Sequence, residues 1–190
     1  MDKFIQIKKK NLGFNVMREL NSLEQLVKEL PTDAVYKFIS EGNFSSIAFI
    51  KFVAERSHIK EMSVSTLRVG KKHLAVLNVL HSQDKLDKVD FIIGSLMKDD
   101  STLGKGYKYY DTLSSVCKAN GWTISVLNNH SKVILLNTDK GYYVIETSSN
   151  LNENPHMEQF SFEQSKELYD MYYEAFNEVI GRRNKDANKE

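Results

Sequence analysis

Apolar residues recur along this chain with two periods, one typical of helices and the other typical of strands. Spacings of three and four positions predict helices over residues 16–30, 47–53, 74–80, 109–117 and 168–179. Short runs rich in branched and aromatic residues predict strands over residues 34–39, 62–67, 89–93, 122–126, 132–136, 142–146 and 157–162. Pro31 ends the first predicted helix and Gly121 ends the fourth.

The order of these segments predicts the fold class. Up to residue 126, strands and helices alternate with short connections, which favours parallel strands between layers of helices. Beyond that point, two strands flank Asp139-Lys140-Gly141, a sequence typical of a hairpin turn, so the later strands are expected to be antiparallel. We therefore expect an α/β fold with a mixed, largely parallel β-sheet flanked by helices on both faces.

The composition is that of an ordinary globular protein. The chain has 190 residues, of which 41% are hydrophobic, and a formal net charge of +1. Two prolines and no linker-like stretch favour a single domain over residues 1–181, whereas the polar residues 182–190 are expected to form a flexible tail. The near balance of charge excludes a uniformly basic coat for nucleic acid, although a local basic patch stays open.

Other features limit the compartment and the cofactors. A single cysteine, Cys117, excludes an internal disulfide and a zinc site built from cysteines. The charged N-terminus does not resemble a signal peptide, and no run of about 18 apolar residues could cross a membrane. A cytoplasmic location is expected. Binding to a membrane is not expected, because no amphipathic helix with a basic face stands out.

Polar residues are dense around the predicted hairpin. His130 and Lys132 stand two positions apart where its first strand begins, so they are expected to face the same side. Ser148 and Asn150 have the same spacing just after its second strand, and Glu158 opens the next strand. Because the turn brings the outer ends of a hairpin together, these five side chains are expected to converge.

This set of residues resembles the HxK, SxN and Glu signature of the phospholipase D superfamily. The resemblance is strongest to the small members of bacterial or phage type, which carry one such motif per chain. The resemblance covers about thirty residues, and it implies a phosphodiesterase or nuclease that works without metal or cofactor. Because each chain carries one motif and the reaction uses two histidines, it also implies a homodimer. The same likeness to small nucleases suggests nucleic acid rather than lipid as substrate.

The resemblance also implies roles for individual residues. His130 would be the nucleophile, and His130 of a second subunit would be the general acid. Lys132, Ser148 and Asn150 would hold the phosphate, and Glu158 would fix a histidine tautomer. Residues near the motif that could contact substrate are Asn152 and His156.

The chain departs from the family pattern at two positions. Asn137 stands where the family has an aspartate that supports structure, and Thr147 stands where it has a glycine. An HxK triplet alone carries little weight, because the chain has a second one, His58-Ile59-Lys60, with no Ser-x-Asn after it.

Three alternatives stay open at this stage. The polar residues Ser148, Asn150 and Asn152 could simply cap turns, as these residue types often do. The fold could serve a catalytically inactive module that binds DNA or another protein. A phospholipid hydrolase is the third alternative.

Overall fold

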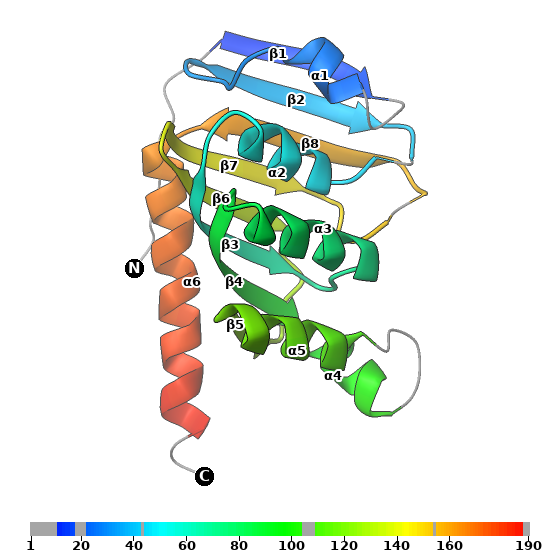
Figure 1. Ribbon diagram of the computed structural model, residues 1–190, viewed down its shortest axis with the longest axis vertical. Coiled ribbons are helices and arrows are strands. Elements are labelled where there is room, and N and C mark those ends of the chain that lie inside the picture. Colours follow the sequence, from blue (N-terminus) through cyan, green and yellow to red (C-terminus); the bar gives the residue numbers. More distant parts are fainter. Residues whose placement is uncertain (1–10, 18–21, 43, 104–108, 154, 188–190) are drawn as a thin grey trace.

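The computed structural model describes residues 11–17, 22–42, 44–103, 109–153 and 155–187 (Figure 1). The strands are β1 (Asn11–Met17), β2 (Ala34–Ser40), β3 (Ile59–Thr66), β4 (Leu86–Gly94), β5 (Thr123–Leu127), β6 (Val133–Thr138), β7 (Gly141–Thr147) and β8 (Glu158–Gln164). The helices are α1 (Ser22–Leu26), α2 (Ile47–Ala54), α3 (Lys71–Ser82), α4 (Ser95–Thr102), α5 (Tyr110–Asn120) and α6 (Lys166–Ala187).

The strands form one sheet in the order β1-β2-β8-β7-β6-β3-β4-β5. The pairs β1–β2, β3–β4 and β4–β5 are parallel. The pairs β2–β8, β8–β7, β7–β6 and β6–β3 are antiparallel. The prediction of a mixed sheet is confirmed, but "largely parallel" is only partly right, because the β6–β7 hairpin and β8 lie between the two parallel halves.

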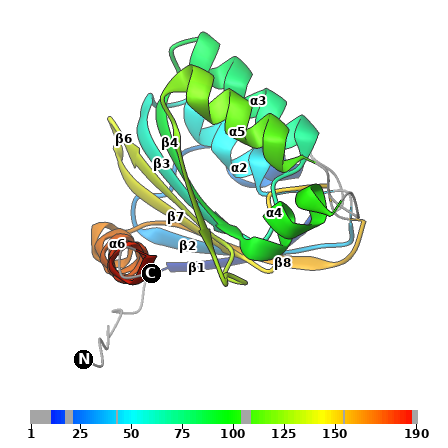
Figure 2. The ribbon, with the colours of Figure 1, turned by 90° about the horizontal axis from the view of Figure 1, so that it is seen from below.

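Helices cover both faces of the sheet, as predicted (Figures 1 and 2). On one face lie α2, α3 and α5, whose Phe49, Leu77 and Leu113 are fully buried in the larger core cluster. On the opposite face, Leu168 and Tyr169 of α6 pack against β6 and β7 in a smaller cluster. None of the helices in the described part of the chain has the length and apolarity needed to span a membrane.

The N-terminal prediction is wrong in part. Residues 11–17 form β1, which pairs with β2, so the first two positions of the predicted helix 16–30 belong to a strand. Ser22–Leu26 form α1, residues 27–30 are not helical, and residues 18–21 lie outside the described residues. Leu12, Phe14 and Val16 alternate with other residues at the period of a strand, and this weaker signal overlaps the helical spacing that starts at Val16. Helix α4 was not predicted.

At the C-terminus, α6 continues to Ala187, past the last apolar residue of the predicted helix. The expected flexibility of residues 182–190 stays a prediction.

The strand ends that matter for function lie together along one side of the sheet, at the C-terminal ends of its parallel strands, and we call this side the edge of the candidate site. The parallel strands β3, β4 and β5 end there, and the antiparallel arrangement brings the end of β7 and the starts of β6 and β8 to the same edge. The register pairs Ser65 with Val133, Val133 with Glu146, and Thr147 with Phe160. Ligands of α/β proteins usually bind beyond the carboxyl ends of the parallel strands, which is this edge.

Candidate active site

His130 and Lys132 lie together just before β6. The Nζ atom of Lys132 is 3.2 Å from Nδ1 of His130 and donates to the His130 carbonyl oxygen at 2.7 Å. Partial burial lowers the pKa of Lys132, and the negative charge of Glu158 opposes this shift. A lysine ammonium has only donors, so in its contact with the ring Nδ1 of His130 is the acceptor.

Ser148 and Glu158 form a second pair at the same edge. The hydroxyl of Ser148 donates to Glu158 Oε2 and accepts from the backbone N–H of Gln159 at 3.1 Å. The N–H of Ser148 donates to the Gln159 carbonyl, also at 3.1 Å. These bonds fix the end of β7 against the start of β8 and place the Glu158 carboxylate where its charge acts on Lys132. The predicted role of Glu158 in setting a histidine tautomer stays a prediction.

Asn150 is held by β3. Its Oδ1 accepts from the Leu67 N–H at 3.2 Å and from the Thr66 hydroxyl at 3.4 Å. The Thr66 hydroxyl in turn accepts from the Leu151 N–H at 3.0 Å. The amide oxygen of Asn150 therefore fastens the loop after β7 to the end of β3. This observation favours the interpretation that Asn150 stabilises a turn, and it leaves the amide NH₂ as the part that could donate to a phosphate.

Asn152 and His156 lie in the loop between β7 and β8. The Asn152 N–H donates to the Asn150 carbonyl at 2.8 Å, and its backbone packs against Gly70, which directly precedes α3. His156 is exposed. Their roles in substrate binding stay predictions.

Asn129 is a site residue that the motif comparison missed. Its Nδ2 donates to Ser65 Oγ at 2.9 Å and to the Ile92 carbonyl at 2.8 Å. Its Oδ1 accepts from the N–H and the hydroxyl of Ser131 at 2.9 and 2.8 Å. Asn129 therefore ties the segment that carries His130 to both β3 and β4. Asn129 lies in the polar run before the hairpin, but its partners are far away in sequence.

Two polar positions singled out by the sequence lie away from this edge. Asn137 is near the far end of β6, five residues beyond Lys132, which is about 17 Å along a strand. The second HxK triplet precedes or opens β3 at the opposite edge, where His58 contacts Asp87 at 2.8 Å and Lys60 contacts Asp139 at 2.8 Å. Neither position takes part in the candidate site.

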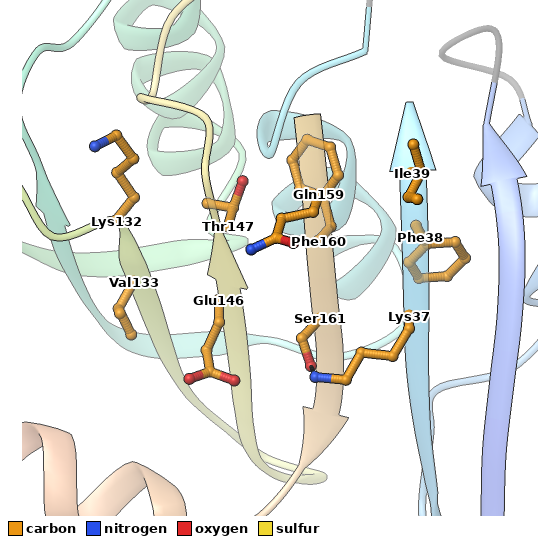
Figure 3. Close-up of a pocket in the computed structure, with 10 residues that line it drawn as sticks. All are labelled: Lys37, Phe38, Ile39, Lys132, Val133, Glu146, Thr147, Gln159, Phe160 and Ser161. Carbon is orange, nitrogen blue, oxygen red and sulfur yellow. Dashed lines mark hydrogen bonds between the residues drawn. The ribbon is translucent and has the colours of Figure 1, made fainter. Parts of the chain in front are cut away.

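A groove of about 610 Å³ opens on the sheet beside Lys132 (Figure 3). It crosses β6, β7, β8 and β2 and is lined by Lys37, Phe38, Ile39, Lys132, Val133, Glu146, Thr147, Gln159, Phe160 and Ser161. Figure 3 shows Lys132 at one end and Lys37 at the other, where Lys37 Nζ donates to Ser161 Oγ at 2.8 Å. The groove gives an extended ligand room next to the HxK pair.

Among the residues that the structure describes, no group of three or more His, Cys, Asp or Glu side chains is arranged to hold a metal ion. The sulfur of Cys117 is buried in α5, and burial raises its pKa to about 12.

Comparison with known proteins gives structural neighbours only. No protein-family model matches the sequence. No curated protein matches it either. The fold is similar to polyphosphate kinase from Porphyromonas gingivalis, with a TM-score of 0.57 and 14% identity over 77% of this chain. It is also similar to phosphatidylserine synthase from Haemophilus influenzae Rd KW20, with a TM-score of 0.52 and 14% identity over 85% of this chain.

Both neighbours are members of the phospholipase D superfamily. The matched region is 26% of the polyphosphate kinase and 43% of the phosphatidylserine synthase, so this chain spans less than half of either protein. At this level of identity the likeness shows a shared fold, which is the fold that the HxK and SxN residues led us to expect.

Proposed function

We propose that this protein is a metal-independent phosphodiesterase, acting on nucleic acid, with His130 as its nucleophile. The observation that carries the proposal is the contact of Lys132 with His130 at the sheet edge where Ser148 holds Glu158. The shared fold supports it, because both structural neighbours are named as enzymes that handle phosphate groups.

The chemistry divides into two displacements at phosphorus. In the first, Nε2 of His130 forms a bond to phosphorus while the bond to the leaving oxygen breaks, and the leaving alkoxide takes a proton from a second, protonated histidine. In the second, that histidine removes a proton from water, the water oxygen attacks phosphorus, and the bond to Nε2 breaks. Lys132 supplies positive charge to the phosphoryl oxygens in both steps.

The Lys132 contact has a consequence for the first step. When Nδ1 of a neutral His130 accepts from Lys132, the ring proton resides on Nε2, and that nitrogen has no lone pair with which to attack. Attack through Nε2 therefore requires Lys132 to move from Nδ1 to the phosphate, so that Nδ1 can carry the proton. Substrate binding would then activate the nucleophile.

The need for a second histidine is the basis for a homodimer. Each chain supplies one HxK and SxN pair at this edge, so a twofold arrangement would place two His130 rings around one phosphate. Sedimentation of the protein at assay concentration tests this part, and a strictly monomeric but active particle would contradict it.

The central test uses bis(p-nitrophenyl) phosphate and plasmid DNA in the presence of EDTA. We expect wild-type turnover, loss of turnover in His130→Ala, and retention in His58→Ala, the matched control from the second HxK triplet. Mass spectrometry of acid-sensitive adducts, with quenching at high pH, should detect a p-nitrophenylphosphoryl group on wild-type protein treated with bis(p-nitrophenyl) phosphate but not on His130→Ala. Turnover that survives in His130→Ala would refute the proposal.

A non-catalytic module is the second candidate. It is favoured because the amide oxygen of Asn150 accepts hydrogen bonds from Thr66 and Leu67 at the end of β3, which is a structural role. No turnover of any substrate, together with salt-sensitive DNA binding, would support this candidate. Turnover of phosphatidylcholine vesicles but not of DNA would instead identify a lipid hydrolase.

A further inference from the structure

Arg68 lies in the loop that connects β3 to α3, beside the SxN residues of the candidate site. Ser65 near the end of β3 pairs with Val133 at the start of β6. The two strands are therefore about 4.8 Å apart at the point where β3 continues to Arg68 and where Lys132 precedes β6. No sequence motif includes this arginine, so it could not be selected before its position in the fold was known.

The loop that carries Arg68 is fastened on the side of the SxN residues. The Leu67 N–H donates to Asn150 Oδ1 at 3.2 Å, and the Gly70 N–H donates to the Leu151 carbonyl at 2.7 Å. A bridge between Val69 and Leu151 continues the same contact. The backbone on both sides of Arg68 is therefore fixed to the segment that follows Ser148.

The side chain of Arg68 is also oriented. Its Nη2 lies 3.1 Å from Oδ2 of Asp100 on α4, and the two side chains are 31% and 23% exposed. A guanidinium presents five N–H donors in a planar fork, so it can keep a carboxylate on one side while it binds a phosphate on another. An ion pair that holds an arginine in place in this way lowers the entropy that is lost when a ligand binds.

We infer that Arg68 binds a second phosphate, next to the one that His130 attacks. The inference rests on the proposed function and deepens it, because it predicts that the enzyme prefers a chain of phosphodiesters, as in nucleic acid, to an isolated phosphodiester. Lys132 contacts the scissile phosphate, and Arg68, on the adjoining loop, contacts its neighbour. Arg68 is a specificity-determining residue in this scheme and takes no part in bond making.

The test compares two substrates that release the same p-nitrophenol. The p-nitrophenyl ester of thymidine 5′-phosphate carries one phosphate, and the p-nitrophenyl ester of the dinucleotide pTpT carries two. In Arg68→Ala we expect kcat/KM to fall about tenfold for the second substrate, the size of one charge-assisted hydrogen-bond contact. For the first substrate we expect a change of less than about twofold, well within that size.

Asp100→Asn separates binding from scaffolding. This variant breaks the ion pair but keeps the cation, so both substrates should retain kcat/KM within about threefold, which is less than one lost charged contact. If Arg68 serves only to fasten α4, then Arg68→Ala and Asp100→Asn should lower kcat/KM to the same extent for both substrates. That result, or an equal loss on both substrates in Arg68→Ala, would overturn the inference.

A binding measurement keeps the two proposals distinguishable if the wild type hydrolyses neither ester. The anisotropy of a fluorescein-labelled oligothymidylate is measured as a function of KCl concentration. Arg68→Ala should reduce the slope of log K against log[salt] by about 0.7, the share of one phosphate contact on a single strand. The control Arg56→Ala, which removes an arginine packed on Phe52 just after α2, should leave the slope unchanged.

A reduced slope without turnover would support the Arg68 subsite and refute the chemistry. An unchanged slope in Arg68→Ala would refute the subsite whether or not the protein is an enzyme.

Discussion

Replacing Asn129 by alanine should loosen the attachment of the HxK segment to the sheet. The Asn129 amide makes hydrogen bonds of 2.9 Å to Ser65 Oγ and 2.8 Å to the Ile92 carbonyl. It also accepts bonds of 2.9 and 2.8 Å from the backbone and side chain of Ser131. Alanine removes all of these bonds and adds none.

The expected cost follows from these bonds. A typical intramolecular hydrogen bond contributes about 0.5–1.5 kcal/mol net, and Asn129 is only partly buried, so water can satisfy some of the groups left behind. We therefore expect the free energy of unfolding to fall by about 2–3 kcal/mol in Asn129→Ala. For a chain of this length that corresponds to a Tm lower by roughly 4–12 °C.

Urea denaturation monitored by the fluorescence of Trp122 measures this loss. The neighbouring Asn128→Ala is the matched control, because Asn128 is exposed, and it should change the unfolding free energy by less than about 0.5 kcal/mol. The m-value should stay constant, since the substitution alters local bonds rather than the surface exposed on unfolding. A loss below about 0.5 kcal/mol in Asn129→Ala would refute the claim that this amide holds the segment in place.

Further predictions concern Lys132 and the packing behind the site. Lys132→Ala should reduce kcat, measured by enzyme kinetics, and the affinity for inorganic phosphate, measured by inhibition, because the same cation contacts His130 and would contact the phosphate. A change in Tm of many degrees would instead identify a structural role for Lys132. Gly70→Ala should lower the unfolding free energy by about 1–3 kcal/mol. Its new Cβ would lie 3.1 Å from Cα of Asn152 and 3.2 Å from Nδ1 of His73, and a wild-type denaturation curve would contradict this packing. Burial lowers the pKa of His73 from 6.5 to about 4, so the unfolded state binds the proton first and stability should fall as the pH drops from 6.5 to 4. By linkage this loss is about 3 kcal/mol, and His73→Met should remove that part of the pH dependence in urea titrations at several pH values.

The sequence predicted the local elements well where one period dominated. The helices α2, α3, α5 and α6 and the strands β2 to β8 all overlap predicted segments, because the buried side of each element repeats at its own period. The prediction was wrong for the segment that forms β1, because two periods overlap there: its apolar residues fit a strand and also extend a helical pattern. No local signal decides such a case, because β1 is stabilised by pairing with β2, a separate segment of the chain.

For the candidate site, the sequence by itself determined that His130 and Lys132 flank the same hairpin as Ser148, because a short turn between two strands fixes which ends meet. Only the tertiary structure decided what surrounds them. The insertion of β6, β7 and β8 between the parallel halves brings the end of β3 beside the hairpin, where it binds Asn129 and Asn150 and presents Arg68. Those contacts join residues more than sixty positions apart, and hydrophobic periodicity carries no information about which strands become neighbours.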